Sequence, residues 1–212
     1  MDNKQRKTAN NISIIAECAV LIAVGTILAQ IKIFRMPNGG SVTAASMVPF
    51  LLISYRHGTK WGLLSGFVNA LLQMLLGSIY PPVAPGAAAY FLEILLDYIL
   101  AYMVLGFSGS FCAFFSKLLS KDRAKSPQND KSKMLVSVGI STFVCCLLRF
   151  FCAFLSGFLV WDDVLQNGMA AVIYSLGYNA SYLGPESVIT VIVTLILYKA
   201  YPAFFKSGII YK

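Results

Sequence analysis

Long apolar stretches alternate with short polar connections along this chain of 212 residues. Six stretches carry few charged side chains, and each is predicted to form a helix: roughly 12–32, 43–55, 60–77, 88–118, 134–159 and 169–200. A helix of about twenty apolar residues spans a bilayer. The pattern therefore predicts an all-α membrane protein with six transmembrane helices, in a single domain that covers residues 1–212.

Two of the polar connections have a character of their own. Pro37–Ser41 reads Pro-Asn-Gly-Gly-Ser, and the short helix expected after it begins with Thr43 and Ser46, which suit a protein interior or a wet cavity better than lipid. We expect this turn to lie at the mouth of a cavity. The segment at about 117–133 is polar, charged and contains a proline, which predicts a cytoplasmic linker.

Composition and charge support the membrane class and its orientation. Hydrophobic residues make up 58% of the chain and charged residues 12%, outside the usual range of a soluble domain. The net charge is +8, and fourteen of the seventeen basic residues lie before the first stretch, in the second and fourth connections, or near the end. Because basic residues collect on the cytoplasmic side, we expect N- and C-termini in the cytoplasm and no nucleic-acid partner.

Motifs for enzyme chemistry are absent from the sequence. The five cysteines fall in apolar segments without CxxC or metal spacing, so they read as buried thiols. No HExxH, GxSxG or phosphate-binding loop is present. The chain is therefore predicted not to be an enzyme, and to hold no metal and no cofactor.

Five ionisable residues fall inside the apolar stretches, where they are costly and usually face the interior: Glu17, Glu93, Asp97, Arg149 and Glu186. Glu93 and Asp97 are four residues apart, on the same helical face as Tyr90. The arrangement suits a cationic or hydrogen-bond-donating ligand. The alternative is an ion-pair network in which Arg149 is the counter-ion, although two acids against one base leave one carboxylate free.

Aromatic and amide side chains gather in the same half of the predicted bundle: Tyr80, Tyr98, Trp161, Tyr174, Tyr178 and Asn179. Aromatic faces attract cations and stack on flat rings. Trp161 also fits the aromatic belt at a membrane surface, whereas Tyr174 and Asn179 are expected deeper, where the belt explains them less well.

Four segments together resemble the substrate-binding (S) components of energy-coupling factor (ECF) transporters, specifically the thiamine-specific family: "MPNGGSVTAASMVPFLLISYRHG", "LLDYILAYMVLGFSG", "LLRFFCAFLSGFLVW" and "IYSLGYNASYLGPE". The resemblance covers nearly the whole chain. It implies a thiamine pocket in the outer half of the bundle, closed by the connection that contains Pro37–Ser41.

The resemblance also implies roles for individual residues. The binding set is Asp97, Tyr98, Gly157, Trp161, Tyr174 and Asn179, with Tyr80 as a weaker match. The family commonly has a histidine where this chain has Ala153, and some members have a tryptophan near the position of Gly40. Glu93 or Tyr178 would then compensate, or the ligand is a relative of thiamine.

The resemblance further implies partners. They are a membrane coupling protein and two cytoplasmic ATPases, which use the ATP, in a bacterial plasma membrane. Ala19 and Ala23 form a small-residue stripe on the first helix, where another helix can approach closely; packing inside the bundle is the alternative. The alternative functions are an S component for another vitamin or a pyrimidine-type thiamine precursor, and a membrane scaffold.

Overall fold

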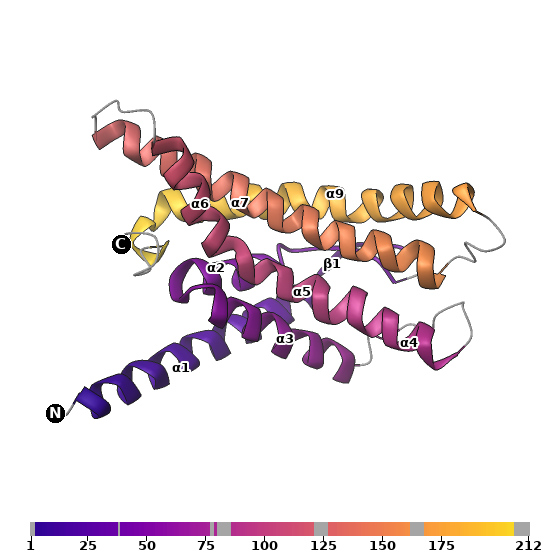
Figure 1. The fold of residues 1–212 in the computed structure, drawn as a ribbon, viewed down its shortest axis with the longest axis horizontal. Coiled ribbons are helices and arrows are strands. Elements are labelled where there is room, and N and C mark those ends of the chain that lie inside the picture. Colours follow the sequence, from indigo (N-terminus) through magenta and orange to yellow (C-terminus); the bar gives the residue numbers. More distant parts are fainter. Residues whose placement is uncertain are drawn as a thin grey trace.

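A bundle of long helices forms most of the computed structural model, which describes residues 3–37, 39–76, 79, 86–120, 127–161 and 168–205 (Figure 1). The first part of the chain contains α1 (Asn3–Gln30), β1 (Lys32–Arg35), β2 (Ser41–Thr43), α2 (Val48–His57) and α3 (Thr59–Leu75). One continuous helical rod follows, made of α4 (Ala87–Glu93), η1 (Ile94–Leu100), α5 (Ala101–Met103), η2 (Val104–Phe107) and α6 (Ser108–Ser120). The last part contains α7 (Pro127–Ser156), η3 (Gly157–Trp161), α9 (Met169–Ala200) and η4 (Pro202–Phe205).

Four helical segments within the described ranges are long and apolar enough to cross a membrane: Asn10–Gln30, Ala87–Leu119, Lys131–Trp161 and Met169–Ala200. Their outer faces carry exposed apolar side chains such as Val20, Phe151 and Ile196, as expected where lipid replaces water. The helix α2 differs because it is only 10 residues long and is buried from Val48 to Tyr55. It forms the centre of the bundle.

The packed core surrounds α2. The hydroxyl of Tyr55 lies 2.8 Å from the hydroxyl oxygens of both Ser141 and Thr142 on α7. The helix α3 crosses η2 at glycines, so closely that a Cβ atom at Gly106 would lie 2.3 Å from the backbone nitrogen of Leu63. This half of the molecule is therefore held by backbone contact and by hydrogen bonds between buried hydroxyls.

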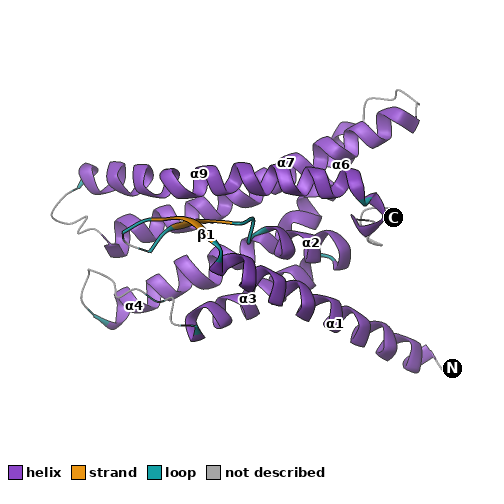
Figure 2. Cartoon of the chain, turned by 180° about the vertical axis from the view of Figure 1, so that it is seen from behind, coloured by secondary structure: helices purple, strands orange, loops and turns teal. Residues whose placement is uncertain are grey.

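The connection after α1 is a β-hairpin, which the sequence did not predict. β1 and β2 pair in antiparallel orientation, with Phe34 opposite Val42 and Arg35 opposite Ser41. The amide of Met36 donates to the carbonyl of Gly40 at 2.7 Å and closes the turn. Figure 2 shows the hairpin running alongside α9, which β2 contacts. The helix expected at 43–55 therefore begins only at Val48, because Thr43 belongs to a strand.

Two other boundaries also differ from the prediction. The helix α1 begins at Asn3 rather than near residue 12, because its polar first turns continue the helix. Much of the predicted linker at 117–133 is helical, since α6 runs to Ser120 and α7 begins at Pro127. In Figure 1, α1 begins and α9 ends at the same end of the molecule, where α6 also ends. The opposite end contains α4 and the start of α9.

Candidate functional site

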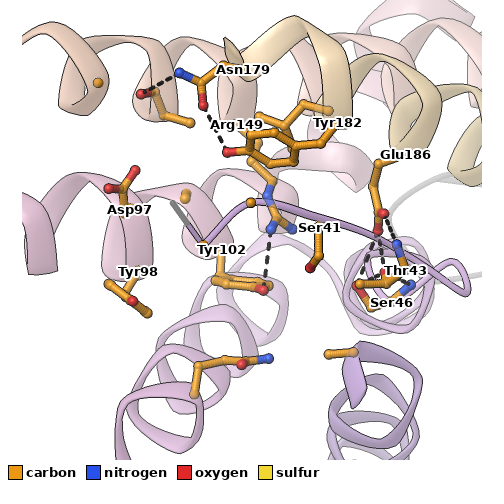
Figure 3. Close-up of a pocket in the computed structure, with 18 of the residues that line it drawn as sticks. Ser41, Thr43, Ser46, Asp97, Tyr98, Tyr102, Arg149, Asn179, Tyr182 and Glu186 are labelled. Carbon is orange, nitrogen blue, oxygen red and sulfur yellow. Dashed lines mark hydrogen bonds between the residues drawn. The ribbon is translucent and has the colours of Figure 1, made fainter. Parts of the chain in front are cut away.

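A cavity of about 330 Å³ opens in the half of the bundle away from the α2 core, beneath the hairpin (Figure 3). Its walls come from the end of α1, from α3, α4, η1 and α5, and from α7, η3 and α9, and the hairpin covers one side. The volume falls at the lower end of the range for small-molecule sites. Seven of the predicted binding residues line it: Glu93, Asp97, Tyr98, Gly157, Trp161, Tyr174 and Asn179. Tyr80, the eighth, lies outside the described residues.

The helical rod changes its hydrogen-bond pattern where it borders the cavity. The segment η1 is a π-helix, whose i→i+5 bonds widen the turn, and such segments often occur at functional sites. Asp97 and Tyr98, which belong to this segment, both line the cavity, together with Glu93 one turn before them. Tyr90 was expected on the same face, but its side chain is exposed and it is not part of the lining.

Asp97 is held by hydrogen bonds from α7 and η3. The hydroxyl of Ser156 donates to Oδ2 at 2.6 Å, and Nε1 of Trp161 donates to the same oxygen at 3.3 Å. The indole ring is thereby fixed beside the carboxylate. A flat aromatic surface and a hydrogen-bond acceptor stand together at this end of the cavity.

Glu93 contrasts with Asp97. Its side chain is 1% exposed, and neither carboxylate oxygen has a hydrogen-bond partner among the described residues. Buried polar groups are paired in the great majority of cases, so an unpaired carboxyl that lines a cavity is unusual. Glu93 is an acceptor that the described part of the protein leaves unused.

Arg149 forms no direct ion pair with the acidic residues of the cavity that the structure describes, contrary to the sequence-based alternative. No carboxylate of the described residues lies within ion-pair distance of it. Its guanidinium instead lies 4.3 Å above the ring of Tyr102, and Nη2 donates to the hydroxyl of Tyr102 at 3.3 Å. Nη1 is buried without a partner in the described structure. The cavity therefore also contains an unused donor.

Three tyrosines follow one face of α9. The rings of Tyr174 and Tyr178 stack with centroids 5.9 Å apart, and Tyr178 meets Tyr182 edge to face at the same separation. The hydroxyl of Tyr182 donates to Oδ1 of Asn179 at 2.8 Å. Nδ2 of Asn179 donates to the carbonyl of Ser175 at 2.9 Å. The amide of Asn179 is thus oriented by its neighbours.

Gly157 allows η3 to lie against α9. A Cβ atom at this position would lie 2.2 Å from Oγ of Ser175 and 3.0 Å from Nδ2 of Asn179. Only glycine fits without moving the groups that orient the amide. The predicted importance of Gly157 thus has a steric cause, which is close approach rather than a turn.

Glu186 anchors the base of the hairpin to α9, as Figure 3 shows. Its carboxylate accepts hydrogen bonds from the amide and the hydroxyl of Thr43 and, at 3.3 Å, from the hydroxyl of Ser46. Near the hairpin turn, Gly40 lies against the ring of Tyr182, where a Cβ atom would approach within 2.6 Å. The hairpin is therefore held both at its base and near its turn.

Sequence reasoning did not assign a site role to Tyr102, Tyr182 or Arg149, although all three line the cavity. The spacing of Tyr174, Tyr178 and Tyr182 is a helical stripe that could have identified Tyr182. Arg149 could have been identified because a charged residue in the middle of an apolar helix usually faces an interior site.

Ala19 and Ala23 lie elsewhere. Both are exposed on α1, and neither lines the cavity. Val20 and Ile27 are exposed on the same helix. The described part of the bundle therefore does not cover this small-residue stripe, which removes the alternative that it packs inside the bundle.

Comparison with known proteins identifies relatives over almost the whole chain. The family described as "Thiamine transporter protein" matches residues 15–206. "Thiamine transporter ThiT" of Bacillus subtilis is 34% identical over 193 residues, which cover 90% of this chain and 93% of the relative. The protein of the same name from Lacticaseibacillus paracasei is 24% identical over 196 residues, covering 91% and 90% of the two chains. The structure of ThiT from Listeria monocytogenes has the same fold, with a TM-score of 0.71 and 23% identity over 92% of this chain and 98% of that one.

Proposed function

Because the chain belongs to the thiamine transporter protein family and is a multi-pass membrane protein, we propose that it is the thiamine-binding S component of an ECF-type importer in a bacterial plasma membrane. It captures thiamine from outside the cell and delivers it with the help of a separate ATPase module. One observation carries the proposal: a fixed carboxylate, Asp97, stands beside an indole ring in a cavity lined by tyrosines.

The chemistry of the cavity suits thiamine. The aminopyrimidine ring of thiamine donates hydrogen bonds, and Asp97 offers a carboxylate to accept them. The thiazolium ring carries a positive charge, which the faces of Trp161, Tyr174 and Tyr98 attract. A charge-assisted hydrogen bond contributes about 1.5–3 kcal/mol and a desolvated cation–π contact about 2 kcal/mol. A few such contacts support nanomolar binding, which corresponds to about −12 kcal/mol.

The remaining predicted residues shape the site. Asn179 presents an oriented amide, and Gly157 keeps the space that this amide needs. Tyr80 completes the proposed binding set, and Glu93 adds an acceptor. The hairpin covers the ligand, with its base fixed by Glu186.

The proposed topology has six transmembrane helices and both termini in the cytoplasm. One feature supports the placement of the termini. The start of α1 and the end of α9 lie at one end of the bundle, where basic residues also collect along the sequence (Figure 1). The cavity lies in the opposite half, and therefore faces outside in this orientation.

The proposed partners are a membrane coupling protein and two ATPases, and the exposed stripe of Ala19 and Ala23 is the proposed docking face. Leucine at both positions is expected to abolish ATP-dependent thiamine uptake into vesicles that contain all subunits, while the purified chain still binds thiamine. The control is Ile27→Leu, a substitution at an exposed position of the same helix that leaves the side-chain volume unchanged. Unchanged uptake by the leucine variant would place the docking face elsewhere.

A titration of the purified chain with thiamine tests the binding function. The chain has two tryptophans, Trp61 and Trp161, and only Trp161 lines the cavity. We expect saturable quenching of tryptophan fluorescence that disappears in Trp161→Phe and is at least tenfold weaker in affinity for Asp97→Asn, about 1.4 kcal/mol. A response to a pyrimidine precursor but not to thiamine would indicate the alternative substrate. No response to either compound would favour the alternative that the chain is a membrane scaffold.

A further inference from the structure

Glu93 and Asp97 line the same cavity but have different surroundings. Ser156 and Trp161 fix Oδ2 of Asp97, whereas both carboxylate oxygens of Glu93 lack a partner among the described residues. Glu93 is also the more deeply enclosed residue, at 1% exposure. The protein thus fixes one acceptor by hydrogen bonds and leaves a second one, one helical turn away, buried and unpaired among the described residues.

An unpaired buried carboxyl is costly, because burial removes the water that would otherwise solvate it. Among the described residues, no group of the neighbouring helix α3 donates a hydrogen bond to Glu93. Asn69 of α3 is completely buried, and both atoms of its amide are also unpaired within the described structure. Gln73 of the same helix lines the cavity. Asn69 does not line the cavity, whereas Glu93 does, so a ligand that brings a hydrogen-bond donor to this wall would pair with the carboxylate of Glu93.

We infer that Glu93 is a specificity-determining residue that accepts a second hydrogen bond from the ligand ring, and this inference rests on the proposed thiamine-binding function. Asp97 and Glu93 together present two acceptors to one ring edge. They select an amino-substituted heterocycle, whose edge donates, and reject the oxo-substituted equivalent, whose oxygen would face two carboxylates. Rejection of this kind is strong where a site leaves buried polar groups unpaired with the wrong ligand.

Two probes that differ only at this edge test the inference. Thiamine carries an exocyclic amine on its pyrimidine ring, and oxythiamine carries an oxo group in its place with the thiazolium ring retained. The affinities of both are measured on the purified full-length chain in detergent by calorimetry. In Glu93→Gln we expect the preference for thiamine over oxythiamine to fall about tenfold, because the amide NH₂ can donate to the oxo group.

Glu186→Gln is the matched control, because it makes the same isosteric change at a buried carboxyl that lines the same cavity. The oxygens of Glu186 accept from Thr43 and Ser46, and the amide NH₂ of glutamine loses part of these bonds, which hold the hairpin. The affinities for both probes should fall together for that reason, but the preference between them should stay within about twofold of wild type. Size-exclusion profiles verify that both variants are folded, and Glu93→Gln removes no hydrogen bond that the described structure contains.

The outcomes separate the two proposals. If wild type does not bind thiamine, the proposed function is wrong. If wild type binds thiamine and Glu93→Gln keeps the wild-type preference, only the inference about Glu93 is overturned. An equal loss of preference in Glu93→Gln and Glu186→Gln would also overturn it. The preference would then depend on the total negative charge of the cavity rather than on a hydrogen bond to Glu93.

Discussion

The two halves of the bundle differ in their unpaired ionisable side chains. Around α2, the hydroxyl of Tyr55 meets two further hydroxyls and a carbonyl, and Ser54 donates to the carbonyl of Gly106 at 2.5 Å. In the other half, Glu93 and Arg149 have buried atoms without partners. Among the described residues, these two are the ionisable side chains with this property, and both line the cavity.

This difference separates stability from function. A fully hydrogen-bonded polar network stabilises one packing arrangement of the side chains. Unpaired buried charges lower the stability of the protein until a ligand forms hydrogen bonds or ion pairs with them. Under the proposed function, the α2 half is the rigid base and the cavity half carries the groups that bind the ligand. Substitutions in the first half should change unfolding, and substitutions in the second should change binding.

The largest expected effect comes from adding one methyl group in the packed half. In Gly106→Ala, the new Cβ would lie 2.3 Å from the backbone nitrogen of Leu63 and 2.5 Å from the backbone carbon of Gly62. Backbone atoms at a helix crossing cannot move aside cheaply, so the variant should lose about 3 kcal/mol of stability. The measurement is the thermal unfolding midpoint of the purified protein in detergent.

The same substitution elsewhere provides the matched controls. Gly184→Ala, with no atom within 4 Å of the new Cβ, should not lower the midpoint. In Gly157→Ala the new Cβ meets the side chain of Ser175, which can rotate. This variant should weaken thiamine binding, and it should lower the unfolding midpoint less than Gly106→Ala does. If Gly157→Ala and Gly106→Ala lowered the midpoint equally, the division between the two halves would be wrong.

The long helices could be predicted from sequence because each is an apolar run of sufficient length. The four candidate spans overlap the predicted stretches at 12–32, 88–118, 134–159 and 169–200. The hairpin could not be predicted in this way. Its strands have four and three residues, too few for an alternating pattern to stand out beside an apolar helix.

Part of the cavity lining could be predicted from the sequence. Six residues carried over from the family resemblance line one cavity together with Glu93, and composition and periodicity alone would not have placed them together. The π-helix η1 could not be predicted, because its apolar sequence is equally suited to an α-helix. The interaction of Arg149 with Tyr102 was also missed, since pairing by charge alone favoured a carboxylate over an aromatic ring.

The smallest expected effects come from removing a single hydroxyl in each half. Tyr55→Phe loses contacts with Ser141 and Thr142, and should lower stability by about 1 kcal/mol while thiamine affinity stays unchanged, because Tyr55 does not line the cavity. Tyr182→Phe loses the bond that orients Asn179, and should weaken thiamine binding about fivefold with little change in the unfolding midpoint. Calorimetric titration gives the thiamine affinity of each variant, and thermal unfolding gives the unfolding midpoint of each. If Tyr55→Phe weakened binding as much as Tyr182→Phe did, the packed half would not be an independent base, and the cavity would depend on the whole bundle.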